Sequence, residues 1–291
     1  MTALSDADVP AWVSALDIPG LYDVHVHFMP PRIMDRVWEH FESRGPLIGR
    51  EWPITYKGPV EERVETLRAI GVRRFSSLPY AHKPGIATYL NDWARTFSAD
   101  TPDSLHSATF FPEESAQGYV GELIAEGVEI FKVHVQVGDF DPRDPLLDEV
   151  WGLLAESGTP VVIHAGSGPV PNSHTGPGPV ADVLRRHPRL TAVIAHMGAP
   201  EYAEFLSLAE SYERVHLDTT MAFTDFFEEL AAYPRSFLPR LAALQDKILL
   251  GSDFPNIPYR YAHQLASLER LDLGEQWLRK VCWENAATLI G

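Results

Sequence analysis

The sequence of 291 residues contains one cysteine, Cys282, so no disulfide can form within the chain. That scarcity predicts a protein of a reducing cytoplasm. No stretch approaches the roughly 20 consecutive apolar residues that a membrane-spanning helix needs. Residues 1–20 are rich in acidic residues and have no apolar run, a pattern that is not typical of a signal peptide. We therefore expect no membrane partner.

Basic residues are also scarce, because 24 Lys and Arg face 40 Asp and Glu, which gives a formal net charge of −16. A field of that sign repels phosphate backbones and anionic lipids, so the composition excludes nucleic acid as a partner. A small-molecule substrate is expected instead. The hydrophobic content of 45%, with no charge run or low-complexity tract, predicts one domain over residues 1–291.

Short apolar or β-branched runs alternate with longer segments of helical spacing along the chain. We predict eight strands, at Leu21–His27, Arg74–Tyr80, Leu105–Phe111, Val128–Gln136, Pro160–Ala165, Leu190–His196, Val215–Thr220 and Lys247–Asp253. Strands that alternate with helices imply right-handed βαβ units and a parallel sheet. Eight units predict an α/β fold of the (βα)8 TIM-barrel type, ahead of a doubly wound open sheet. The barrel is expected to carry a long loop insertion, residues 28–59, after its first strand, and an extra C-terminal helix.

Five side chains that can bind metal fall at the ends of four predicted strands. His25 and His27 are two residues apart, so both point to the same face of the first strand. His164, His196 and Asp253 end the fifth, sixth and eighth strands. The carboxyl ends of barrel strands surround one opening, where barrel active sites are built. Three imidazoles and a carboxylate suit one divalent ion, Zn²⁺ first and Mn²⁺ as an alternative.

Other polar residues near this rim are candidates for substrate contact or for orienting the ligands. Lys132 and His134 share one face of the fourth strand. The lysine is either carbamylated and bridges two metals or, as we prefer, is an unmodified cation. Asp218, near the end of the seventh strand, is expected to orient a histidine.

Three further residues are candidate substrate contacts in the loops of the rim. His82 follows the second strand, and His174 lies in the Gly- and Pro-rich loop after the fifth. Trp52 belongs to the insertion, which we expect to form a lid or a wall against the substrate.

Several motifs resemble those of the amidohydrolase superfamily, and of its amidohydrolase-related branch that includes aminocarboxymuconate-semialdehyde decarboxylase. They are DVHVHFMP, FKVHVQVGDFDPRDPLLDEVWGLLAESGTPVVIHAG, VIAHMG, LDTT and ILLGSDFP, in the family's order from Leu21 to the C-terminus. The resemblance implies that His25, His27, His164 and Asp253 bind the metal. It implies that His196 is a catalytic acid, base or electrophile.

The same resemblance implies an enzyme that is either a hydrolase or a carbon–carbon lyase. We expect first a hydrolase that attacks an amide, lactone or related bond with a metal-activated water. In it Asp253 moves the proton and His196 donates to the oxygen that becomes negative. The alternative is non-oxidative decarboxylation of an unsaturated or aromatic carboxylic acid; a metal-retaining barrel without activity ranks third. The apolar C-terminal helices and the habit of the family favour a homodimer.

Overall fold

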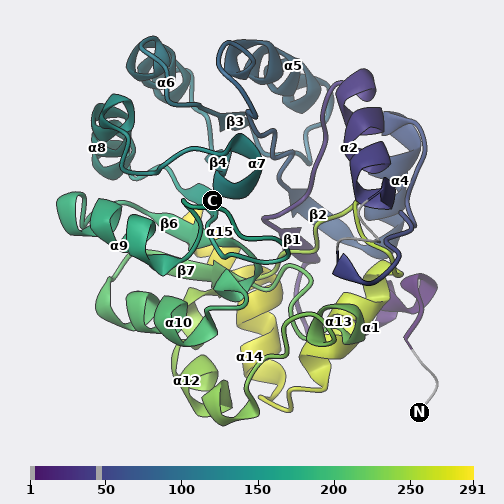
Figure 1. The fold of residues 1–291 in the computed structure, drawn as a ribbon. Helices are drawn as coiled ribbons and strands as arrows, with labels where there is room; N and C mark the ends of the chain where they lie inside the picture. Colours follow the sequence, from purple (N-terminus) through teal and green to yellow (C-terminus); the bar gives the residue numbers. More distant parts are fainter. Residues whose placement is uncertain (1–3, 44–47) are drawn as a thin grey trace.

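The computed structural model describes residues 4–43 and 48–291, and in it eight parallel strands alternate with helices. Figure 1 shows the helices as an outer ring around the strands. The strands are β1 (Leu21–Asp23), β2 (Val72–Phe75), β3 (Ser107–Thr109), β4 (Ile130–His134), β5 (Val161–His164), β6 (Ala192–Ile194), β7 (Val215–Asp218) and β8 (Ile248–Leu249). The order of all eight agrees with the sequence prediction.

The longer helices follow the strands as the βαβ pattern predicts, with short helices at the rim. They are α1 (Val9–Ala15), α2 (Pro31–Ser43), α4 (Val60–Ile70), α5 (Ala87–Asp100), α6 (Ala116–Ala125), α7 (Val135–Gly138), α8 (Asp148–Ser157), α9 (Pro177–Arg186), α10 (Tyr202–Ser211), α11 (Asp225–Glu228), α12 (Leu238–Ala243), α13 (Tyr261–Glu269), α14 (Glu275–Arg279) and α15 (Asn285–Leu289). Among the described residues, no helix combines the length and hydropathy that a bilayer crossing requires.

Backbone hydrogen bonds close the barrel where the regular ladders stop. Strands β3 to β8 form one parallel sheet, and β1 pairs with β2 in another. Between β2 and β3, Leu105 N–H donates to Phe75 O over 2.8 Å. Between the chain after β8 and the chain after β1, Val24 N–H donates to Leu250 O, and Asp253 N–H to His25 O over 2.8 Å. These bonds join both open edges, which confirms the barrel.

The interior at the amino ends of the strands is apolar. Its buried residues form one cluster, comprising Tyr22, Val24, Leu78, Leu105, Ile130, Val162, Val193, Ala195, Leu249 and Ala286. Helix α15 covers this end of the barrel, since Ala287, Leu289 and Ile290 pack on the cluster. Burying each large aliphatic side chain stabilises the fold by roughly 1.5–3 kcal/mol. The extra C-terminal helix predicted from the sequence therefore closes the bottom of the barrel.

The insertion after β1 is not the loop that the sequence suggested. Helix α2 occupies 13 of its residues, and residues 44–47 lie outside the described part of the chain. The helix buries Met34 and Trp38 on one side, an amphipathic pattern that the search for barrel units passed over. Its Ile33, Val37 and Phe41 line a cavity at the carboxyl ends of the strands. The insertion is thus a helical wall.

Candidate metal centre

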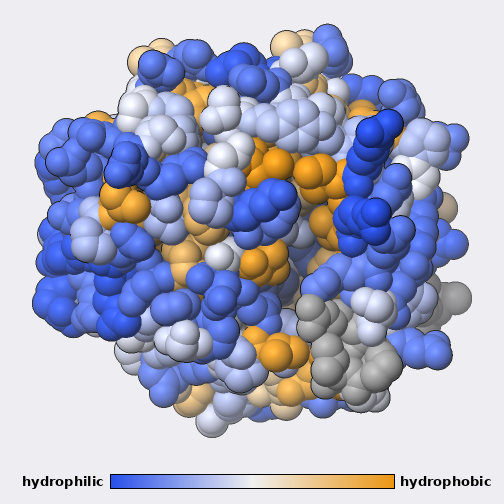
Figure 2. All heavy atoms as spheres, turned by 45° about the horizontal axis from the view of Figure 1, so that its top comes forward, coloured by the Kyte–Doolittle hydropathy of each residue, from blue (hydrophilic) through white to orange (hydrophobic). Residues whose placement is uncertain are grey.

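The cavity at the carboxyl ends of the strands has a volume of about 680 Å³. Figure 2 shows hydrophobic residues gathered around a hollow in this face of the molecule. Four of the predicted metal ligands and the predicted catalytic histidine line the cavity, namely His25, His27, His164, Asp253 and His196. Strand ends far apart in the sequence therefore deliver these side chains to one place, as the barrel argument predicted.

Three of these side chains form a tight, buried group. His25, His196 and Asp253 each offer a ligand atom, and these atoms all lie within 4.8 Å of one another. His25 Nε2 is 3.7 Å from Asp253 Oδ1, and His27 Nε2 is 3.0 Å from the same oxygen. Imidazole nitrogens and a carboxylate oxygen at such spacing fit a divalent transition ion. His27 and His164 are not part of this group of three, so the full predicted ligand set stays a prediction.

Hydrogen bonds fix which nitrogen each of three histidines turns to the cavity. In each case an oxygen contacts Nδ1, so the neutral ring carries its hydrogen there and leaves a lone pair on Nε2. The contacts are His25 to Asp218 Oδ2 (2.8 Å), His27 to Leu78 O (2.8 Å) and His196 to Thr220 O (3.0 Å). Such oxygen acceptors behind imidazoles are the usual support of metal ligands.

His164 is anchored through its other nitrogen. Its Nε2 lies 3.2 Å from Gly168 O, so the neutral ring carries the hydrogen on Nε2 and the lone pair on Nδ1. Burial lowers the pKa of His164 well below its ordinary value, and the nearby His196 and Lys132 act in the same direction. The ring therefore stays neutral, the form that binds metal.

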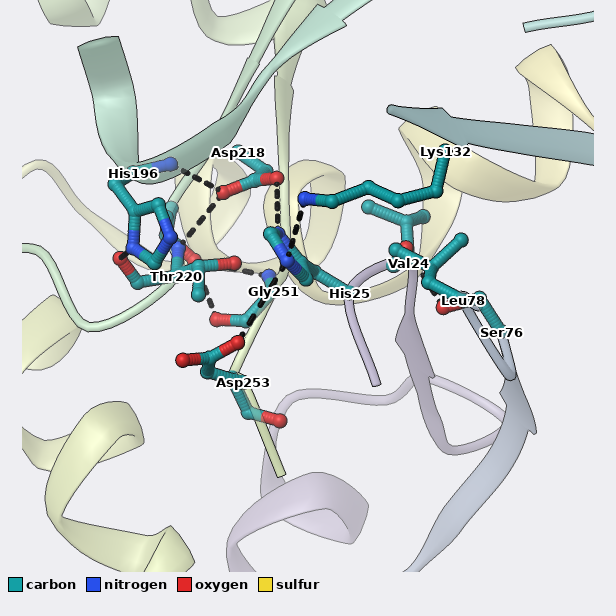
Figure 3. Close-up of polar contacts among 12 residues, drawn as sticks. Val24, His25, Ser76, Leu78, Lys132, His196, Asp218, Thr220, Gly251 and Asp253 are labelled. Atoms are coloured by element: carbon teal, nitrogen blue, oxygen red, sulfur yellow. Dashed lines mark hydrogen bonds and ion pairs between the residues drawn. The ribbon is translucent and has the colours of Figure 1, made fainter. Parts of the chain in front are cut away.

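Asp218 connects two of the predicted site residues (Figure 3). Besides the contact with His25, its carboxylate accepts hydrogen bonds from His196 N–H over 2.9 Å and from Thr220 N–H over 3.1 Å. His196 has the left-handed backbone φ of 54°, which a residue with a side chain rarely adopts. The hydrogen bond that His196 N–H donates to Asp218 holds that backbone in place. The predicted orienting role of Asp218 thus has a geometric basis.

Gly251 permits the close approach of β7, β8 and the chain after β1. A Cβ atom at this position would lie 2.1 Å from Thr220 Oγ1, 2.9 Å from His25 Cβ and 3.3 Å from Asp218 Cγ. Contacts shorter than 3.0 Å force neighbouring atoms apart, so only glycine fits beside the tight group.

Burial and neighbouring groups shift the pKa values of two charged side chains at the cavity, Asp253 and Lys132. Burial acts to raise the pKa of Asp253, but the neighbouring His27, His25 and His196 hold it below its usual range. Burial lowers the pKa of Lys132 to about 8, although Asp218 and Asp253 act to raise it. Lys132 Nζ lies 3.0 Å from His25 Nε2, the nitrogen that faces the group (Figure 3). Asp253 is ionised, and the lysine contacts the first predicted ligand.

The remaining predicted residues divide into those that line the cavity and one that does not. Trp52 lines the wall, where its Nε1 donates to Asn256 O over 2.7 Å. His82 lies at the exposed mouth, and His134 stacks on His164 with ring centroids 3.9 Å apart. His174 is not a lining residue; its Nδ1 lies 3.9 Å from Asp141 Oδ2, outside the cavity.

The search of the sequence overlooked Tyr80, the last residue of the second predicted strand. Its ring lies 5.4 Å from that of His27 and 5.3 Å from that of His134, between centroids, and it lines the cavity. The strand-end rule that found the histidines applied equally to Tyr80.

Comparisons with known proteins agree with this architecture. A family model described as "Amidohydrolase" matches residues 22–291. An uncharacterized TIM-barrel protein from Bordetella bronchiseptica is 19% identical with a TM-score of 0.73, over 92% of this chain and 98% of that one. No curated protein matches the sequence significantly.

Two further solved structures carry names of enzymes. A 5-carboxyvanillate decarboxylase from Novosphingobium aromaticivorans, solved with bound manganese, is 14% identical with a TM-score of 0.62, over 94% of this chain and 97% of that one. A probable 2-pyrone-4,6-dicarboxylic acid hydrolase from Acinetobacter baumannii, solved with citric acid, is 14% identical with a TM-score of 0.59, over 94% and 100%. Identities this low establish the fold alone.

Proposed function

The chain belongs to the amidohydrolase family, and on that premise we propose that it is a metal-dependent hydrolase of an amide, lactone or related bond in a small molecule. The observation that carries the proposal is that His25, His27, His164 and Asp253 line one cavity together with His196, and that ligand atoms of His25, His196 and Asp253 lie within 4.8 Å of one another. A divalent ion supplies Lewis-acid chemistry, lowering the pKa of water from about 15.7 to about 7.

The chain's own residues provide the ligands and the proton transfers. We propose His25, His27, His164 and Asp253 as ligands of one Zn²⁺ or Mn²⁺ ion, with Lys132 unmodified. Asp253 is ionised, so it can accept the proton of the attacking water and pass it to the leaving atom. His196 carries its ring hydrogen on Nδ1, so in its neutral form it receives a proton at Nε2 before it can donate one. This changes its expected role from an immediate donor to a proton carrier.

A second candidate function is the decarboxylation of an unsaturated or aromatic carboxylic acid. The observation that favours it is the apolar wall beside the polar group, formed by Ile33, Val37, Phe41 and Trp52. An aromatic ring would be buried against such a wall while a carboxylate faced the histidines. Location in the cytoplasm and assembly as a homodimer are proposed on sequence grounds alone.

The reaction is tested by a screen of lactones, amides and aromatic or muconate-type acids with metal-replete protein, following acid and CO₂ release in parallel. We expect acid release that disappears after dialysis against dipicolinate and returns with Zn²⁺ or Mn²⁺. Full activity in metal-free protein contradicts the proposal. Release of CO₂ without a hydrolytic product moves the assignment to the lyase.

The ligand set is tested by metal content. We expect about one ion per chain in the wild type and in His196→Asn, and loss of the ion in His164→Asn. The reverse result exchanges the roles of these two histidines. Two ions per chain favour the carbamylated form of Lys132.

A further inference from the structure

His134 differs from His25, His27, His164 and His196 in the direction of its hydrogen bond. Val137 N–H donates to His134 Nδ1 over 3.3 Å, because His134 is the residue before the first turn of α7. A nitrogen that accepts a hydrogen bond carries no hydrogen, so the neutral ring has its N–H at Nε2. The His134 ring therefore presents its N–H at Nε2, whereas each of the four rings anchored by an oxygen acceptor has its lone pair on the opposite nitrogen.

Tyr80 supplies a second neutral donor beside His134. The two rings are tilted by 56° with centroids 5.3 Å apart, and both line the cavity. A tyrosine hydroxyl has an ordinary pKa near 10, so it carries its hydrogen at neutral pH and can donate. Neither this hydroxyl nor His134 Nε2 has an acceptor among the residues that the structure describes.

Two other amide side chains that line the cavity, those of Gln136 and Asn172, already donate to protein acceptors. Gln136 Nε2 donates to Val170 O. Asn172 Nδ2 lies 3.1 Å from Asp139 Oδ1 and 3.3 Å from Gln136 O. Donors with satisfied acceptors gain little from a ligand, because the new bond replaces an existing one. Tyr80 and His134 keep their hydrogens available.

The donor pair also lies next to the proposed ligands. Tyr80 contacts the ring of His27 with centroids 5.4 Å apart, and His134 stacks on His164 at 3.9 Å. A substrate oxygen beside an ion held at these ligands would therefore lie near both donors. Preorganised neutral donors stabilise an oxygen that carries or gains negative charge, because they need no rearrangement during the reaction.

We propose that Tyr80 and His134 form a binding site for a carboxylate or acyl oxygen of the substrate, beside the oxygen that the metal polarises. This inference rests on the proposed metal-dependent function, which it deepens by requiring a substrate with a planar acyl or carboxylate group at the reacting end. His134 then supplies the stabilising hydrogen bond that the sequence had assigned to His196.

The test measures the affinity of zinc-loaded protein for benzoate, by calorimetry, together with the zinc content of each variant. Tyr80→Phe removes one oxygen and His134→Leu removes one N–H. Each is expected to weaken benzoate binding about 10-fold, the loss typical of a hydrogen bond to a charged group, while zinc stays bound. His134→Gln, whose amide can donate near the position of Nε2, should recover most of the affinity.

Two controls separate binding from general damage. Tyr89→Phe removes a hydroxyl from a tyrosine that is 53% exposed, and should change neither benzoate affinity nor zinc content. The double variant Tyr80→Phe, His134→Leu should lose less than the product of the two single effects, because both donors serve one oxygen. Unfolding temperatures of all variants establish that each is folded.

The proposal is overturned if wild-type zinc protein does not bind benzoate, or if both single variants bind it as tightly as the wild type. Loss of zinc together with benzoate in His134→Leu overturns it too, because His134 is then a ligand. Failure of the proposed metal-dependent function gives a different result from failure of the donor pair. In that case the wild type binds no zinc, but any affinity for benzoate still falls when Tyr80 or His134 is changed.

Discussion

The two ends of the barrel interior are built from different residues and have different backbones. At the amino end, Ile130, Val162, Val193 and Leu249 pack with α15 in an apolar cluster. At the carboxyl end, the chain at the strand ends presents histidines and Asp253 to a cavity, and Lys132 and Asp218 are buried in contact with His25. Successive inward positions of one strand thus serve both ends, as Ile130, Lys132 and His134 do on β4.

The backbone also differs between the two ends of the barrel, because left-handed residues gather at the carboxyl end. Five of the non-glycine residues with left-handed φ angles follow β6, β7 and β8 at the carboxyl end, namely His196, Met197, Met221, Phe223 and Asp253. Each such residue costs roughly 1–2 kcal/mol relative to an ordinary conformation. The apolar end therefore stabilises the fold, and the polar end holds strained residues in the positions that its chemistry requires.

The sharpest way to test this division is to change charge at the carboxyl end without changing shape. Asp253→Asn should reduce turnover of the identified substrate at least ~10²-fold, because the proton acceptor is lost, while the unfolding temperature changes little. Asp272→Asn is the matched control, since Asp272 is also a left-handed aspartate but is exposed and far from the cavity. Near-normal turnover in Asp253→Asn contradicts the proton-transfer role.

A smaller effect is expected one contact further from the cavity. Asp218→Asn removes the charged acceptor behind His25 Nδ1, so zinc affinity should fall about 10- to 100-fold. Competition with a chromophoric chelator measures this affinity. Asp246→Asn, a surface change near the C-terminal helices, serves as the control. Unchanged affinity would show that the His25 ring is oriented without Asp218.

Acid should destabilise the fold through His216, a buried histidine at the level of the apolar cluster. His216 pairs in register with Val193, and burial lowers its pKa to about 4. The unfolded chain, with a pKa near 6.5, binds this proton more readily. The stability that neutral His216 provides is therefore complete above about pH 6.5 and is lost as pH falls toward 4.

His216→Gln should flatten that dependence by up to about 1.4 kcal/mol per pH unit, measured as urea unfolding between pH 7 and pH 5. His174→Gln, at the surface, controls for the loss of a histidine. An unaltered slope in His216→Gln means that the proton is bound equally well in the folded chain.

The smallest effect is expected from trimming the apolar cluster. Ile130→Val removes one buried methylene and should lower the free energy of unfolding by about 0.5–1.5 kcal/mol. Turnover of the folded enzyme should not change, because Lys132 and His134 keep their positions on β4. A loss of turnover would show that packing at one end controls geometry at the other.

Strand periodicity was enough to predict the order of the eight strands and the rim that carries the histidines. Helix α2 was missed because the barrel scheme expects one helix between two strands, and α4 already fills that place. Residue types at strand ends pointed to His25, His27 and Asp253. The direction of each ring could not be predicted, because it depends on partners such as Leu78, Thr220 and Val137 that only folding brings near.

The division of roles between His134 and His196 shows the same limit. Both are histidines at strand ends, and nothing in their own sequence neighbourhoods separates a donor from an acceptor. Val137 lies only three residues after His134, yet its N–H is aimed at the ring because the chain turns into α7 there. Local backbone geometry of that kind decides which ring nitrogen donates, but it cannot be recognised from the residue types alone.

The contact at Gly251 also constrains how this sequence can diverge. A saturation library at position 251, selected for catalysis, should return glycine alone, since even a methyl group would displace His25 and Thr220. Exposed positions on the outer helices should accept many residue types under the same selection. Glycine at position 251 is therefore required for the shape of the site, although Gly251 takes no part in any reaction.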